Sequence, residues 1–152
     1  MRYPVAFAML VLVSALTIPV WAFPADDKDP DQQSIAALEA RINQAQPREQ
    51  CYLYAELIHQ MTEVSVRQYT AGDVGKANVL LHEIQNIAHK MHLSVGGNDK
   101  RLKNAEILLR RTAFRLNEML HSSDLEDRPL VAATLAQVNQ ADNEAMMQVF
   151  KK

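Results

Sequence analysis

Glycine is scarce in this sequence, and so is the alternation of apolar and polar residues that marks β-strands. The 152 residues include only 4 glycines, and no stretch of four or more residues alternates in a strand-like way. Glycine-containing turns and alternating strands are the usual signs of β proteins. Their absence, together with abundant alanine, leucine, glutamine and glutamate, predicts an all-α protein.

Motifs that would indicate an enzyme or a cofactor-binding protein are also missing. The chain has no C-x-x-C-H haem-attachment motif, no phosphate-binding loop, no G-x-S-x-G elbow and no dinucleotide fingerprint. Cys51 is the only cysteine, so an internal disulfide cannot form, although a disulfide to another chain stays open. Its place in the helical pattern predicts a thiol at the edge of the core. We expect no enzymatic activity and no cofactor.

The charges show no excess of either sign. The formal net charge is −2. It becomes −3 without the first 22 residues, which carry one arginine and no acid, because 15 basic and 18 acidic residues remain. This balance gives no electrostatic reason to bind nucleic acid or an anionic membrane. We therefore predict a soluble globular domain without a nucleic-acid partner.

The N-terminus has the features of a secretory signal peptide. Arg2 gives a positive start, residues 5–21 carry no charge, and Val20 and Ala22 place small residues before a cleavage site. We predict cleavage after Ala22 and export to a periplasm or the extracellular space. The alternative is a membrane anchor over residues 5–23, whose 19 residues approach the ~20 that span a bilayer. A membrane is an expected partner only in that case.

The rest of the chain is predicted to be a short leader and one helical domain. Residues 23–29, with the sequence FPADDKD, are polar and contain proline, which predicts a flexible leader. Asp29, Pro30 and Gln32 then have the arrangement of a helix N-terminus, with a capping residue followed by proline in the first turn. The predicted domain covers residues 30–152.

Five segments of this domain carry apolar residues at helical spacing. We expect a short helix that ends before Pro47, then longer helices over about 48–71, 74–93 and 100–121, and a last one from about 129 nearly to the C-terminus. The four long helices predict an antiparallel four-helix bundle with a short extra N-terminal helix, or alternatively stacked helical hairpins. The predicted core consists of Leu57, Met61, Leu80, Ile84, Leu109, Leu116, Leu135 and Val138.

Two Glu-x-x-His sequences are of the kind that binds metal ions in ferritin-like bundles. They are Glu56 with His59, and Glu118 with His121. At about 100° per residue, these side chains lie roughly 120° to 180° from the apolar stripe of their own helix. We therefore expect all four on the solvent face, where they cannot build an interior metal site.

The predicted helix over 74–93 carries polar groups that are candidates for binding. His89 and His92 are three residues apart and are the weak candidates for a metal site, since one turn of helix can supply two ligands. A longer stripe of uncharged hydrogen-bonding side chains runs along the same face. Because depletion of charge is typical of the centre of protein interfaces, we predict that this stripe contacts a partner or a second copy. It consists of His82, Gln85, Asn86 and His89.

The predicted function is therefore that of an exported helical protein that binds a partner or itself. Two alternatives stay open. One is a metal- or ligand-binding periplasmic protein that uses the histidines of residues 74–93, and the other is a membrane-tethered helical domain that retains its N-terminal segment.

Overall fold

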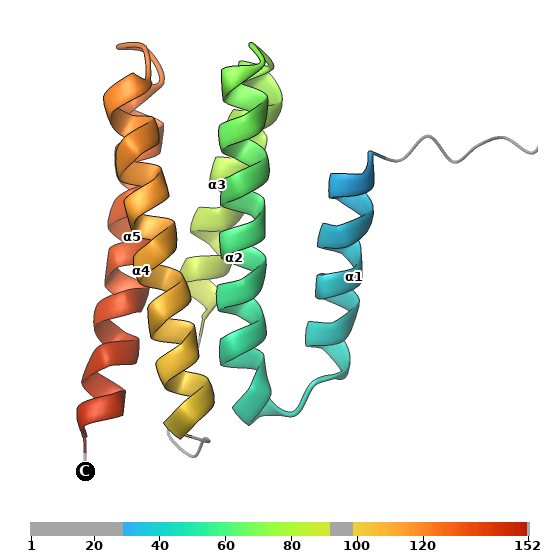
Figure 1. Ribbon diagram of the computed structural model, residues 1–152, viewed down its shortest axis with the longest axis vertical. Helices are drawn as coiled ribbons and strands as arrows, with labels where there is room; N and C mark the ends of the chain where they lie inside the picture. Colours follow the sequence, from blue (N-terminus) through green and yellow to red (C-terminus); the bar gives the residue numbers. More distant parts are fainter. Residues whose placement is uncertain (1–28, 92–98, 152) are drawn as a thin grey trace, which may run out of the picture.

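The computed structural model describes residues 29–91 and 99–151, and it confirms an all-α protein: these residues contain five helices and no strand (Figure 1). None of the five is long and apolar enough to cross a lipid bilayer. The predicted signal peptide, residues 1–22, and the leader up to residue 28 lie outside the described part of the chain. The helices are α1 (Pro30–Gln44), α2 (Pro47–Thr70), α3 (Val74–Lys90), α4 (Asp99–Ser122) and α5 (Arg128–Phe150).

The helix ends follow local signals. Asp29 caps α1, because its side chain accepts a hydrogen bond from the backbone N–H of Asp31 at 3.2 Å. α2 starts with Pro47, whose missing N–H is of no consequence in the first turn. The chain leaves α2 through Gly72, whose φ of +88° is readily adopted only by glycine. Asp73 stands at the N-cap position of α3, as predicted, but its side chain makes no capping hydrogen bond.

The four long helices pack as two hairpins side by side (Figure 1). α2 pairs with α3 and α4 pairs with α5, while the hairpins meet through α2 against α4 and α3 against α5. α2 and α4 run in one direction, and α3 and α5 run in the other. Neighbours within a hairpin are therefore antiparallel, and neighbours from different hairpins are parallel.

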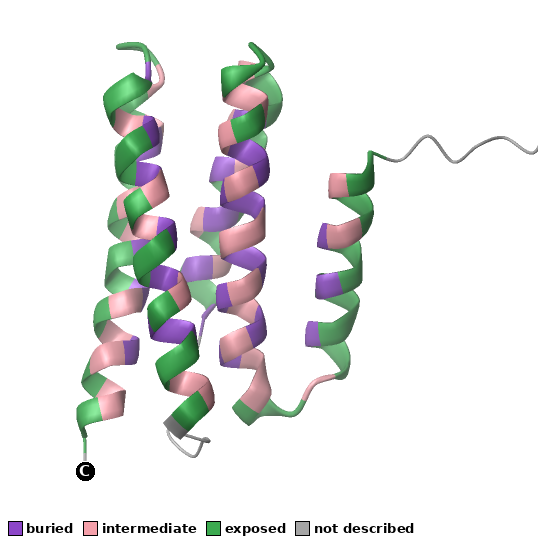
Figure 2. Ribbon diagram, in the orientation of Figure 1, coloured by how far each residue is buried: buried purple, intermediate pink, exposed green. Residues whose placement is uncertain are grey.

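α1 lies outside these hairpins and, among the described helices, packs on α2 alone (Figure 1). Its buried side chains are Ile35, Leu38 and Ile42. Polar contacts also hold it, including an ion pair of 2.8 Å between Asp31 and Arg67. α2 consequently touches three helices and is buried around much of its circumference (Figure 2). Its buried residues are Cys51, Leu53, Ala55, Leu57, Ile58, Met61, Thr62, Val64 and Ser65.

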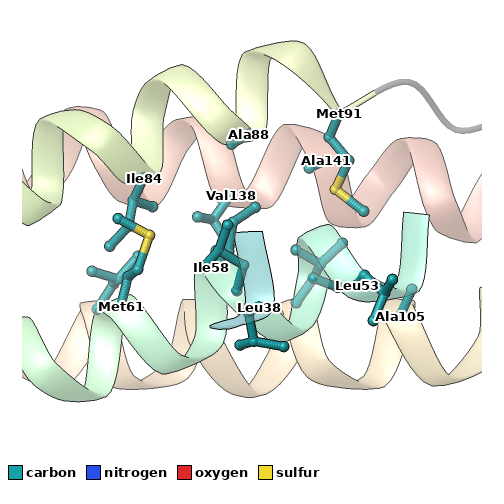
Figure 3. Close-up of a cluster of buried hydrophobic side chains, with 14 of the residues drawn as sticks. Leu38, Leu53, Ile58, Met61, Ile84, Ala88, Met91, Ala105, Val138 and Ala141 are labelled. Carbon is teal, nitrogen blue, oxygen red and sulfur yellow. The ribbon is translucent and has the colours of Figure 1, made fainter. Parts of the chain in front are cut away.

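The core lies between the helices of the two hairpins (Figure 3). Of the predicted core, six residues are buried as expected: Leu57, Met61, Ile84, Leu109, Leu116 and Val138. The prediction was wrong for Leu80 and Leu135, which are only partly buried. α3 and α5 each touch two neighbours, so the buried arc of each helix is narrow. Leu80 lies beside that arc and lines an open groove between α1 and α3.

A polar network closes the end of the bundle where the α4–α5 connection lies. The carboxylate of Asp127 accepts hydrogen bonds from the Tyr69 hydroxyl and from the Asn78 amide, both at 3.1 Å. The same hydroxyl accepts a bond of 2.9 Å from the backbone N–H of Asp124. Asp127 therefore ties α2 and α3 of one hairpin to the start of α5 in the other.

Candidate functional site

α4 carries the largest concentration of positive charge in the helices. Its sequence contains six basic residues and three acidic ones, in a chain whose formal net charge is −2. The core side of α4 is formed by buried residues such as Leu109 and Leu116. The intervening positions, which include Arg110, Arg111 and Phe114, face away from the core.

A groove runs between this outer side of α4 and the neighbouring side of α2. Its volume is about 360 Å3. Phe114 is 63% exposed, which is unusual for a large aromatic side chain that has a hydrophobic core available. We call this feature the Phe114 groove, and its lining residues are His59, Glu63, Arg110, Arg111, Phe114 and Arg115.

The three arginines of the Phe114 groove differ in how far their charge is already matched. Arg115 bonds both oxygens of Glu63, at 2.9 and 3.3 Å, and Glu118 at 2.7 Å. These hydrogen bonds, first those to Glu63, raise the pKa of Arg115 above its usual value. Arg110 pairs with Glu106 but remains 65% exposed. Arg111 makes no ion pair within residues 29–91 and 99–151, so positive charge is available at one end of the groove.

His59 lies on the α2 side of this groove, where the sequence had predicted a solvent-facing residue. Its Nδ1 is 3.1 Å from the hydroxyl of Thr112 on α4. That hydroxyl donates its proton to the Leu108 carbonyl at 2.8 Å, so Nδ1 of His59 is the donor in the contact. The expectation was wrong because α2 has three helical neighbours rather than one. A side chain opposite one buried stripe of α2 therefore contacts another helix.

The other residues of the two Glu-x-x-His sequences also make separate contacts. Glu56 is half-buried and faces Arg41 of α1 at 3.9 Å. Glu118 binds Arg115, and the Nδ1 of His121 donates to the carbonyl of Asn117 at 2.7 Å. In the part of the chain that the structure describes, no three His, Cys, Asp or Glu side chains are grouped to hold a metal ion.

The stripe predicted on α3 is divided between solvent and the bundle. His82, Asn86 and His89 are exposed. Gln85 is half-buried, and its amide donates a hydrogen bond of 2.8 Å to the Thr134 hydroxyl on α5. Gln85 therefore helps to join the two hairpins, and three of the four residues remain available to a partner. His92, the second residue of the weak metal candidate, lies outside the described residues.

A larger hollow of about 760 Å3 opens where α3 and α5 end. Met91, which lines this hollow, is the last described residue before the gap that ends at Asp99. We therefore assign no site to it. Its lining includes Met91, Glu144, Met146, Met147, Gln148, Phe150 and Lys151.

Cys51 is buried, not at the edge of the core as the helical pattern predicted. It is 5% exposed, and burial raises the pKa of its thiol to about 11. At neutral pH the group is therefore a protonated thiol, whereas a nucleophile or a metal ligand requires the thiolate. The predicted position of Cys51 was wrong for the same reason as that of His59, since α2 is covered on several sides.

Cys51 gives a testable pH dependence. The unfolded thiol titrates near pH 9.0 and the folded one near 11. Between these values the unfolded state loses a proton that the folded state keeps. The contribution of the thiol to the free energy of unfolding is therefore fully present below pH 9 and is lost as the pH rises above 9. Chemical denaturation from pH 8 to 11 should show that the free energy of unfolding falls more steeply for the unsubstituted protein than for Cys51→Ala. Parallel curves for the two proteins would contradict the burial of this thiol.

Comparison with known protein families, curated proteins and solved structures found no match to this chain. The Phe114 groove is therefore identified as the candidate site by its geometry.

Proposed function

We propose that this chain is an exported, non-enzymatic helical protein that binds a protein partner through the Phe114 groove. In this proposal the four-helix bundle of two hairpins is the scaffold that holds the groove. One observation carries the proposal, which is the 63% exposure of Phe114 beside arginines on the outer side of α4. Aromatic residues and arginine are the residue types that dominate binding energy at protein interfaces.

The other chemically capable groups support binding rather than catalysis. The thiol of Cys51 is buried and protonated at neutral pH. His59 contacts Thr112, and Glu118 is paired with Arg115. These side chains are engaged in contacts between or along helices, whereas Phe114 makes no comparable contribution to the core.

Site-specific cross-linking tests this function. A photoreactive phenylalanine analogue is placed at position 114, in cells that export the protein. The control carries it at position 125, where Leu125 is also highly exposed, at 80%, but lies in the connection between α4 and α5. We expect a discrete cross-linked protein from position 114 only. Phe114→Ala should weaken the isolated complex about 30-fold, the effect of losing a 2 kcal/mol interface residue.

The proposal would be wrong if position 114 gave no cross-linked product or the same products as position 125. An unchanged affinity in Phe114→Ala would also remove the groove from the contact.

Export forms a separate part of the proposal. We expect the mature protein to start at Phe23, because Val20 and Ala22 are the small residues of a cleavage site at the end of the uncharged segment. N-terminal sequencing and intact mass of the exported protein measure this directly. A membrane-bound protein that still begins at Met1 would instead favour the tethered alternative.

The exposed residues of the α3 stripe are a second proposed contact of the same binding function. His82, Asn86 and His89 face solvent and lie away from the Phe114 groove. The double variant His82→Glu/His89→Lys keeps the net charge of the neutral stripe and places charges in it. We expect weaker association in sedimentation velocity or with the cross-linked partner. Unchanged association would leave these residues as ordinary solvated surface.

A further inference from the structure

We infer that the partner of the Phe114 groove is an acidic protein segment that places one large apolar side chain beside Phe114. This inference rests on the proposed function and specifies the chemistry of the partner. The segment's carboxylates would pair with Arg111 and Arg110, and its apolar anchor would cover the exposed ring.

The arginines that line the groove favour an acidic partner. Glu63 and Glu118 already neutralise Arg115. Arg111 is exposed and makes no ion pair in the described ranges, and Arg110 is 65% exposed despite its contact with Glu106. A guanidinium binds a carboxylate through two parallel hydrogen bonds, which adds geometric specificity to the attraction. A basic partner would meet the like charges of Arg111 and Arg110.

The apolar part of the surface requires an anchor side chain. Phe114 is 63% exposed, and Ile107, two turns earlier on the same side of α4, is 37% exposed. The groove volume of about 360 Å3 lies at the lower end of the roughly 300–1,000 Å3 of small-molecule sites. This space suits one or two side chains of a protein segment.

A second copy of this chain and a lipid surface fit the groove less well. A two-fold contact with the α4 helices parallel would bring Arg110 and Arg111 of both copies together, and like charges facing each other cost energy. An antiparallel contact centred on Phe114 would place Arg110 opposite Glu118 of the second copy, whose carboxylate already bonds Arg115 of its own chain. A head-to-tail contact forms a ring where the rotation closes and an open chain where it does not, and it would seat the groove against a different surface of the second copy. Binding to anionic lipid typically uses clusters of four to eight basic residues, whereas this groove is lined by three arginines, two of which are paired with glutamates.

Fluorescence anisotropy with a defined peptide tests the inference on the mature protein. The probe is a labelled helical peptide with several glutamates around one phenylalanine. One control peptide replaces the glutamates with lysine, and another replaces the phenylalanine with alanine. We expect only the original probe to bind measurably, and its affinity to fall as salt is raised.

Matched variants locate the binding site. Arg111→Glu should raise the Kd about tenfold or more. Lys90→Glu makes the same change of charge at an exposed position on α3 and should stay within about twofold. Phe114→Ala should also weaken binding about tenfold or more. Circular dichroism confirms that each variant keeps its helices, and Arg111→Gln supplies a milder change of charge at the same position.

The outcomes separate this inference from the proposed function. If position 114 cross-links a partner but the acidic probe fails to bind, the binding function stands and the acidic chemistry is wrong. The acidic chemistry would also be wrong if the lysine peptide bound as tightly as the original probe. The same holds if Arg111→Glu and Lys90→Glu lost equal affinity for the probe. Binding to phosphatidylserine vesicles that Phe114→Ala abolishes would identify a lipid surface. A dimer in sedimentation velocity that Arg111→Glu dissociates would identify a second copy.

Discussion

Replacing Ile84 with aspartate should lower the free energy of unfolding by about 4 kcal/mol or more. Ile84 is fully buried in α3, and its side chain points toward Met61 of α2 (Figure 3). The substitution removes apolar contacts that are worth about 2 to 5 kcal/mol in comparable truncations. It also introduces a carboxylate without a partner in an apolar environment. Urea denaturation followed by circular dichroism measures the change.

Val79→Asp is the matched control for this substitution. Val79 is also a β-branched aliphatic residue on α3, but it is 58% exposed, so the aspartate would remain in water. Its effect should be within about 0.5 kcal/mol. A loss below about 1 kcal/mol for Ile84→Asp, or equal losses for the two variants, would contradict the assigned core face of α3.

Asp127→Ala should cost about 2 to 3 kcal/mol, although Asp127 is not part of the hydrophobic core. The change removes the acceptor for both Tyr69 and Asn78. Hydrogen bonds to a charged group contribute more than those between neutral groups, and the two donors would be left partly buried without their partner. The hairpins would then lose the bonds to Asp127 at this end, while the bond from the Asp124 N–H to the Tyr69 hydroxyl would remain. Thermal and urea denaturation at neutral pH measure the effect.

Two further variants test the origin of that loss. Glu126→Ala removes an exposed carboxylate next to Asp127 in the chain and should be nearly neutral. Tyr69→Phe should cost about 1 kcal/mol, and in the double variant with Asp127→Ala the two losses should not add, because both remove the same hydrogen bond. Full additivity would show that Tyr69 and Asp127 act independently.

Most helix boundaries were predicted well from the sequence, although α3 ends at Lys90 and not near residue 93. Asp29, Pro47 and Gly72 act through their own backbone or side-chain chemistry, within a few residues along the chain. Such signals do not depend on which helices become neighbours. The apolar stripe of α4 was equally readable, since both of its predicted core residues, Leu109 and Leu116, are fully buried.

The surroundings of α2 could not be predicted in the same way. A single apolar stripe on this helix implied that Cys51 lay at the core edge and that His59 lay in solvent. In the structure, α1 and α4 cover additional sides of α2. Helical periodicity gives the direction of each side chain relative to its own helix axis. It does not give the number of helices that surround the axis.

The Phe114 groove was missed because sequence reasoning examined polar and metal-binding patterns. A usable signal was present on α4, where Phe114 stands seven residues after Ile107, on the opposite side from Leu109 and Leu116. An aromatic residue outside the apolar stripe and among arginines is a pattern that can be searched for. The contribution of His59 and Glu63 from α2 depends on tertiary packing and has no such signal.

The attachment of α1 to a single neighbour has a consequence for local unfolding. Because α2 is the one described helix that α1 contacts, α1 can detach while the packing between the two hairpins persists. Its amide protons should therefore exchange with solvent at a lower free energy than those of α2. Detachment leaves an uncovered apolar strip on α2 and a free helix bearing Ile35, Leu38 and Ile42. The α1 of a second copy matches that strip as well as the original one does, which is the structural requirement for domain swapping.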